Sequence, residues 1–194
     1  MLLFLAVSCT GMVAAGLGDP QPAVLTLIPI PESPNLKISI AFSGFEIIEG
    51  ACGASLRIPG QASTATPGAP DVPGIPKLVP GIKGMRAVLT LHGFDPTNVL
   101  DVIVAPAKGY TREVPEGSGR VLPPQRQPDP GIYRTAEFWP SELGRVDEAW
   151  IGTQKVVRVE CFPVQYNPVL KTIRFYRRLE GVLRFERIEN SPSP

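Results

Sequence analysis

The sequence predicts an all-β fold, a two-layer antiparallel β-sandwich with long loops rich in proline and glycine. The chain holds 23 prolines and 19 glycines among 194 residues, roughly double the usual share. Proline is poorly tolerated inside helices because it removes a hydrogen-bond donor and clashes with the preceding turn. Several segments alternate apolar and polar residues with the two-residue period of a half-buried strand. Three of them follow one another near the C-terminus, and their apolar faces need a second layer to cover them.

The length and charge of the chain limit the number of domains and the kinds of partner that we expect. A chain of 194 residues suits one domain, or at most two small ones, and can bury a sizeable core. Hydrophobic residues make up 43% of it, which argues against global disorder. Charge is balanced, with 19 Lys and Arg against 18 Asp and Glu, so the chain has no basic stripe to meet a phosphate backbone. We expect no nucleic-acid partner.

The N-terminal segment predicts export. Residues 1–17, MLLFLAVSCTGMVAAGL, contain an apolar run over 2–15 and no Lys or Arg. The run is too short to span a bilayer comfortably, and residues 13–16 are small enough for signal cleavage. We therefore expect a signal peptide over 1–17 and a secreted, periplasmic or cell-surface protein that is free of the membrane after cleavage. Cys9 after Ser8 loosely matches a lipoprotein cleavage site, which is the alternative.

Two cysteines remain if Cys9 leaves with the signal peptide. In an oxidising compartment Cys52 and Cys161 could form a disulfide, which would close a long loop and stabilise the fold. They could equally be two buried small hydrophobic residues. Spacing alone does not decide between these alternatives.

The strands fall into three groups, separated by loop-rich stretches. Residues 18–60 contain the first group, whose role the sequence leaves open. Residues 60–84 are so rich in Pro and Gly that they exclude a helix and any central strand. Residues 106–131 form a second loop-rich stretch. The expected strands are 23–30, 35–40, 45–48, 85–92, 98–105, 154–162, 171–176 and 181–188, with turns at 93–96, 166–168 and 180–181.

The sequence contains no pattern that indicates a catalytic or metal-binding site. The single histidine, His92, could in principle activate the thiol of Cys52 or Cys161, but Cys161 sits within an expected strand on its core-facing side. One His and scattered Cys lack the spacing of metal ligands. The acidic pairs, 147–148 and Glu186 with Glu189, resemble solvated strand faces. We expect no catalytic site, no metal and no cofactor.

The last third of the chain carries a family resemblance. Residues 151–157 are IGTQKVV and residues 161–176 are CFPVQYNPVLKTIRFY. This stretch resembles the C-terminal part of the propeptide of gingipain-type cysteine peptidases. The most specific motif is the run Gln165, Tyr166, Asn167 and Pro168.

Three upstream segments agree with the same family in order. Residues 99–109, VLDVIVAPAKG, resemble a family strand, and residues 133–140, YRTAEFWP, resemble its aromatic-rich segment. Residues 68–80, GAPDVPGIPKLVP, are similar more loosely. The resemblance covers residues 65–188, and the first 60 residues match the family less well.

The resemblance implies that residues 61–190 are a gingipain-type propeptide β-sandwich. Such a non-catalytic domain helps a caspase-like cysteine peptidase domain to fold, in cis or in trans. It then covers the active-site cleft of that domain until proteolysis removes it. Residues 191–194, rich in Ser and Pro, would then be a linker or tail. The alternatives are a secreted β-sandwich that serves in binding or adhesion and, ranked last, an enzyme using His92 and Cys161.

The resemblance also implies an inhibitory loop. In the family this loop follows the strand that residues 99–109 resemble, and it offers a basic side chain to the specificity pocket of the peptidase. The corresponding stretch here is 108–126. Arg112 is the first candidate for the blocking residue, followed by Arg120 and Arg126. The alternative is that these are solvated loop arginines, which holds if the partner is not specific for Arg or Lys.

Overall fold

The computed structural model describes residues 13–14, 20–61, 66–108 and 126–188. Nearly all of its regular elements are strands, which confirms the all-β prediction. Within these residues no helix is long and apolar enough to cross a membrane. The elements in chain order are β1 (Val13–Ala14), β2 (Val24–Pro29), β3 (Leu36–Ala41), β4 (Glu46–Ile48), β5 (Ser55–Arg57), β6 (Ile75–Pro80), β7 (Met85–Val99), α1 (Pro130–Tyr133), β8 (Gly144–Ile151), β9 (Gln154–Cys161), β10 (Val164–Asn167) and β11 (Thr172–Arg187).

Strand β11 organises the fold because it pairs along both of its edges. One edge pairs with β7 over almost its whole length, from Ile173 opposite Val99 to Arg187 opposite Met85. The other edge pairs first with β10 and then with β3, and β2 pairs with the far edge of β3. We call these five strands the long sheet. All of these pairings are antiparallel. Residues 24–41 therefore belong to the same sheet as the C-terminal strand.

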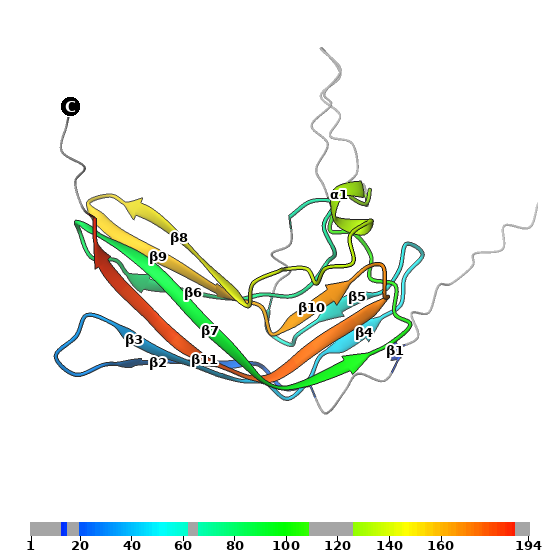
Figure 1. Cartoon of the computed structure of the whole chain (residues 1–194), viewed down its shortest axis with the longest axis horizontal. Coiled ribbons are helices and arrows are strands. Elements are labelled where there is room, and N and C mark those ends of the chain that lie inside the picture. Colours follow the sequence, from blue (N-terminus) through cyan, green and yellow to red (C-terminus); the bar gives the residue numbers. More distant parts are fainter. Residues whose placement is uncertain (1–12, 15–19, 62–65, 109–125, 189–194) are drawn as a thin grey trace, which may run out of the picture.

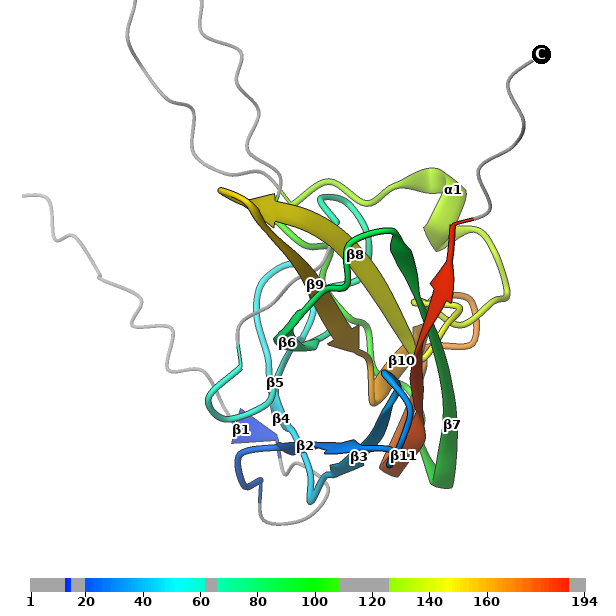
Figure 2. The ribbon, with the colours of Figure 1, turned by 90° about the vertical axis from the view of Figure 1, so that its left-hand side faces the viewer.

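Two smaller sheets complete the layers. Strands β6, β9 and β8 form one, and β1, β4 and β5 form the other. The β6–β9–β8 sheet covers one half of β7 and β11, and the β4–β5 hairpin lies near the other half (Figure 1). Figure 2 shows the long sheet curling from β2 and β3 to β7, with β8 and β9 facing it across the core. This arrangement confirms the antiparallel sandwich, and it places the proline-containing strand β6 at a sheet edge, where proline is tolerated.

The core lies between these layers and is built mainly of apolar side chains. Ile38 and Leu179 from the long sheet and Val159 from β9 are completely buried. Near the bend of β11, the ring of Phe175 packs against Phe42 and Phe45 at centroid distances of 4.8 and 5.5 Å. The N-terminal strands therefore supply part of the same core as the rest of the chain.

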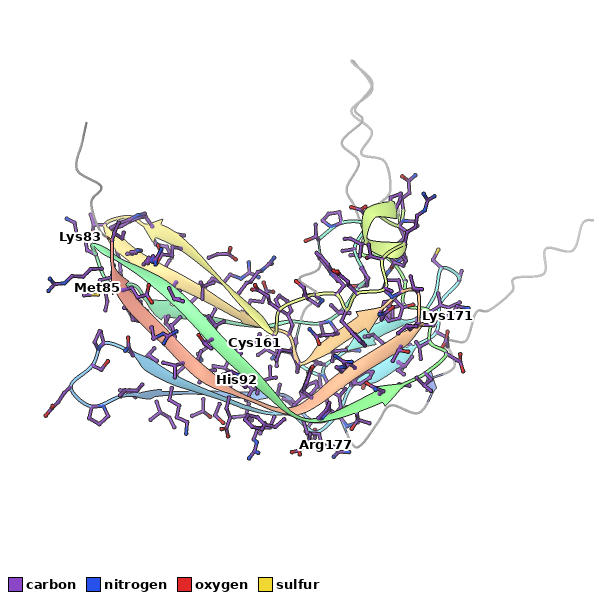
Figure 3. The ribbon with its side chains drawn as sticks, in the orientation of Figure 1. Lys83, Met85, His92, Cys161, Lys171 and Arg177 are labelled. Carbon is purple, nitrogen blue, oxygen red and sulfur yellow. The ribbon has the colours of Figure 1, made fainter. Side chains whose placement is uncertain are left out.

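The two longest strands differ from the sequence prediction. Turns were expected at 93–96 and 180–181, but β7 and β11 continue as strands through both positions. The glycines there serve close approach instead: a Cβ on Gly181 would overlap the carbonyl oxygen of Thr90, and one on Gly93 would overlap the ring of Tyr176. Both strands bend near Arg177, where the Arg177 carbonyl accepts a hydrogen bond from the Phe42 N–H at 3.0 Å (Figures 1 and 3).

The disulfide that the sequence left open between Cys52 and Cys161 does not form. Cys161 is completely buried in β9, whereas Cys52 is exposed in the connection between β4 and β5, and both are free. The two thiols do not meet because one belongs to the core and the other to the surface. Cys161 alone fits the alternative of a buried small hydrophobic residue.

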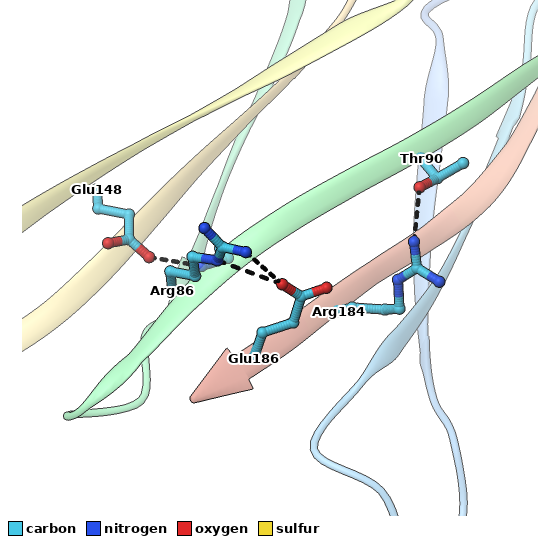
Figure 4. A network of polar contacts seen from close by, with 6 residues as sticks. Arg86, Thr90, Glu148, Arg184 and Glu186 are labelled. Carbon is cyan, nitrogen blue, oxygen red and sulfur yellow. Dashed lines mark hydrogen bonds and ion pairs between the residues drawn. The ribbon is translucent and has the colours of Figure 1, made fainter. Parts of the chain in front are cut away.

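One carboxylate expected on a solvated face joins two layers instead. Glu148 on β8 lies 2.7 Å from Lys155 Nζ and accepts a hydrogen bond from the Ala87 N–H of β7 at 2.7 Å. The Lys155 side chain is only 7% exposed and also donates to the Met85 carbonyl. Figure 4 shows Glu148 beside the start of β7, close to the ion pair between Arg86 and Glu186 across β7 and β11.

This environment lowers the pKa of Glu148. Burial alone would raise the pKa, but the hydrogen bonds from Lys155 and Ala87, together with the charge of Lys155, outweigh it. A carboxyl group whose pKa is lowered by folding stabilises the fold above its unfolded pKa and loses that contribution as pH falls.

We predict that Glu148→Gln lowers the free energy of unfolding by about 1–2 kcal/mol at neutral pH. The deficit should shrink as pH falls and disappear below the lowered pKa of Glu148, where the wild-type carboxyl is protonated as well. Urea unfolding at a series of pH values measures this. The control is Glu186→Gln, which breaks an exposed pair worth less than about 1 kcal/mol. A deficit that stays constant with pH would contradict the assignment.

We also predict that Gly181→Ala lowers the free energy of unfolding by about 3 kcal/mol, because the added methyl group has no room beside Thr90. Thermal or urea unfolding measures it. Gly152→Ala is the control: its Cβ would meet nothing within 4 Å, and only its φ of +60° is unfavourable, at a cost of about 1 kcal/mol. Equal losses in the two variants would show that the close approach is not what requires Gly181.

Candidate functional site

The candidate site is formed by the residues that flank segment 109–125 on its two sides, which we call the base. Residues 104–107, which lead into that segment, are buried and held between two other parts of the chain. The Ala105 N–H donates to the Ala54 carbonyl at 2.8 Å, and the Ala107 N–H donates to the Ala69 carbonyl at 2.7 Å. Backbone hydrogen bonds on both sides therefore hold residues 105–107 in place.

The far end of segment 109–125 returns to the same place. Nη1 of Arg126 lies 3.1 Å from Oδ2 of Asp71 and donates a hydrogen bond of 2.8 Å to the Pro106 carbonyl. The two side chains are 21% and 12% exposed, so water screens this ion pair only partly. The arginine therefore ties the end of the segment to its beginning.

Backbone hydrogen bonds of Gly68 also link the two sides of the base. The Gly68 N–H donates to the Ala107 carbonyl at 3.2 Å, and the Gly68 carbonyl accepts a hydrogen bond of 2.8 Å from the Asp129 N–H. Gly68 thus bonds one residue from each end of the base. The Asp129 side chain then accepts a hydrogen bond of 2.8 Å from the Gly131 N–H and caps α1.

Two tyrosines bond to the backbone of the base. The Tyr133 hydroxyl donates to the Val104 carbonyl at 3.0 Å. Burial, chiefly, raises the pKa of Tyr133 well above its usual range; Tyr166 and Asp71 raise it further, and Arg126 opposes them. Burial also raises the pKa of Tyr166, against the effect of a hydrogen bond with the Val104 backbone. Both phenols stay protonated at ordinary pH, so Tyr133 remains a hydrogen-bond donor.

The motif at 165–168 has a structural role in this site. Gln165 Nε2 donates to the Pro140 carbonyl at 2.7 Å. Tyr166 exchanges two backbone hydrogen bonds of 2.8 Å with Trp139. Asn167 Oδ1 accepts from the Leu170 N–H at 2.9 Å, which closes the turn that Pro168 begins. The motif is buried up to Asn167, so it holds the segment at 133–140 against the long sheet.

The four segments that carry the family resemblance therefore meet at one base. Residues 68–71 and 104–107 pair with each other, and Tyr133 and Tyr166 both reach the Val104 backbone. The sheet adds a further contact to the aromatic segment, because the Arg174 guanidinium lies 3.8 Å from the centre of the Phe138 ring. Segments far apart in the sequence thus build a single platform.

The comparison with known families agrees with this arrangement. The family described as Propeptide_C25 matches residues 17–193. The chain belongs to that family. The resemblance to gingipain-type propeptides that the sequence indicated is thereby confirmed, and the match extends it over the N-terminal strands.

Solved structures show that the Propeptide_C25 fold seen here is shared. One is a structure of gingipain K from Porphyromonas gingivalis that addresses its zymogenic latency, with a TM-score of 0.69, 20% identity and coverage of 91% of this chain and 100% of that one. Another is the complex of the pro- and mature domains of RgpB from the same organism, with a TM-score of 0.65, 20% identity and coverage of 91% and 90%. No curated protein sequence matches this chain.

The candidate arginines of this Propeptide_C25 domain have different placements. Arg112 and Arg120 lie outside the described residues, so their role stays a prediction. Arg126 is described, and its guanidinium is engaged by Asp71 and Pro106 within the domain. The structure therefore gives Arg126 a part in the base, a role that sequence reasoning missed because residues 60–84 carry no signal that would single out Asp71 as its partner.

The candidate nucleophile lies in surroundings that oppose reactivity. Burial, with a smaller effect of the Glu160 charge, raises the pKa of the Cys161 thiol to about 12, whereas reactive cysteines have lowered values. His92 is exposed on β7, opposite Glu180 of β11. In the described part of the chain, no three His, Cys, Asp or Glu residues gather as metal ligands would.

We predict that Arg126→Ala lowers the free energy of unfolding by about 1–3 kcal/mol, because it leaves the Asp71 carboxylate without its guanidinium partner. Urea unfolding measures the loss. The matched control is Arg184→Ala, which removes one exposed hydrogen bond of 3.3 Å to Thr90 and should change stability by less than about 0.5 kcal/mol. Unchanged stability in Arg126→Ala would show that the side chain does not hold the base.

Proposed function

We propose that this chain is the latency propeptide of a gingipain-type cysteine peptidase. It assists the folding of the peptidase domain, covers its active-site cleft with segment 109–125 and is removed by proteolysis. Membership in the Propeptide_C25 family supports this role. So does the fold shared with structures concerned with gingipain K latency and with the complex of RgpB pro- and mature domains.

The observation that carries the proposal is the construction of the base. All four segments that resemble the family converge at the residues that flank segment 109–125, and Arg126 donates a hydrogen bond of 2.8 Å to the Pro106 carbonyl. A binding segment whose ends are already held loses less conformational freedom on association. A fixed base thus favours tight occupation of a partner cleft.

Among the three arginines, we assign the blocking role to Arg112 first and to Arg120 second. A basic side chain would pair with a carboxylate in the specificity pocket of a peptidase that prefers basic residues. Arg126 ranks last because its guanidinium already bonds Asp71 and Pro106. If the partner peptidase is not specific for basic residues, none of the three arginines takes this role.

The family membership also supports the choice of partner. It is a caspase-like cysteine peptidase domain, met in cis or in trans, in a secreted, periplasmic or cell-surface setting. The apolar N-terminal run over residues 2–15 supports export.

We predict that the purified chain, added in trans, inhibits a mature gingipain-type peptidase domain at micromolar concentration or below. The mature domains of RgpB and gingipain K are the first to test. Arg112→Ala should raise the inhibition constant by about tenfold or more, as expected for a basic anchor in a buried pocket. Inhibition constants measured on a small peptide substrate give both results.

The matched control is Arg184→Ala, an exposed arginine on β11 outside the base. It should inhibit as the wild type does. Failure of the wild-type chain to inhibit any such peptidase at micromolar concentration would refute the proposed function. Binding to a cell surface without any effect on a peptidase would instead favour an adhesion role.

A further inference from the structure

Four large aliphatic side chains stand exposed at one end of the molecule. Leu100 is 66% exposed, Ile103 55%, Val169 49% and Leu170 60%. They come from two segments, the chain that follows β7 and the turn that joins β10 to β11. We name these four residues the aliphatic end; Lys171, which belongs to the same turn, marks its place in Figure 3.

The backbone that presents these side chains is held in a specific shape. The Val102 N–H donates to the Lys171 carbonyl at 3.0 Å and joins the two segments. Asp101 and Lys171 both have positive φ angles, of 62° and 49°, a region that residues other than glycine seldom occupy. Such positions persist where the surroundings impose them, and they are enriched at functional surfaces. The aliphatic end is therefore a formed surface.

We propose that the aliphatic end is a second contact surface for the peptidase domain, beside the cleft that receives segment 109–125. This inference rests on the proposed function. The occupant is an apolar patch on the rim of that cleft, which would remove the four side chains from water. The gain comes from buried apolar area, so salt does not weaken this contact by screening as it weakens an exposed ion pair.

The position of the aliphatic end carries the argument. Ile103 precedes Pro106 by three residues, so their Cα atoms lie within about 11 Å of each other. A standard interface buries about 800 Å² on each partner, which corresponds to a disc of about 16 Å radius. A peptidase domain that closes over the base at Pro106 therefore has Ile103 within the radius of such an interface. The bond between Val102 and Lys171 places the turn with Val169 and Leu170 beside it.

Exposure alone would not support this inference, because the opposite end has apolar side chains too. Trp150 and Ile151, 56% and 64% exposed, lie at the tip of the hairpin formed by β8 and β9. Figure 1 shows this tip at the end of the sandwich opposite the β10–β11 turn. Within the described residues, no backbone hydrogen bond joins residues 150–151 to the base, so Ile151 provides a matched control for Ile103.

The test compares Ile103→Asp and Leu170→Asp with Ile151→Asp in the trans-inhibition assay, using the mature RgpB and gingipain K domains. All three variants place the same charge at an exposed aliphatic position. We expect the first two to raise the inhibition constant about tenfold or more, at low and at high salt, and Ile151→Asp to leave it unchanged. Thermal unfolding of each variant checks folding, with Ile103→Ser and Ile151→Ser as replacements if an Asp variant does not fold.

The outcomes separate the two proposals. If the wild type inhibits and all variants inhibit equally well, the aliphatic end is not a contact surface and the latency function stands. If all three variants weaken inhibition equally, the effect belongs to the added charge, and the inference also fails. If the wild type neither inhibits nor binds the mature domains in a direct binding measurement, both proposals fall together.

Discussion

The antiparallel ladder between β7 and β11 is the constraint on which the rest of the structure depends. It runs from Val99 opposite Ile173 to Arg187 opposite Met85 without a break in register. Two glycines let the strands and their neighbours approach closely along it, Gly93 against the ring of Tyr176 and Gly181 beside Thr90. The ladder gives both halves of the sandwich a common frame, so the β6–β9–β8 sheet and the β10–β11 hairpin are positioned by the same pair of strands.

The ladder also determines where the candidate site lies. The end of β7 delivers residues 100–107 to the position where segment 109–125 begins. The start of β11 sets the hairpin whose Tyr166 reaches the Val104 backbone from the other side. Around this point, hydrogen bonds from Gly68, Arg126 and Tyr133 close the base. The functional end is thus built from contacts between distant parts of the chain, while the opposite end carries the Glu148–Lys155 link between layers.

The sequence was sufficient for the class of fold and for the segments that meet at the site. Alternation of apolar and polar residues identified β2, β3, β9 and most of β7 and β11, but it missed β6 and β8, and the strand expected at 98–105 ends at Val99. The Gln165–Pro168 run identified the family. Local patterns failed where glycine serves packing, because Gly93 and Gly181 have the same appearance in sequence as turn residues. They also failed for pairing between distant residues. Nothing near Asp71 or Arg126 reveals their ion pair, and Glu148, on an alternating strand, looks solvated until β7 is placed beside it.

The double attachment at Pro106 and Arg126 has a consequence for how such a domain is dismantled. A single cut between residues 109 and 125 would leave both new chain ends bonded to one folded body, through Ala107 to Gly68 and through Asp129 to the same glycine. The two pieces of the nicked protein would therefore stay together in one folded body. Its release from any partner would then depend on the unfolding or further digestion of the sandwich itself, so the stability of the core would set how long a nicked domain persists.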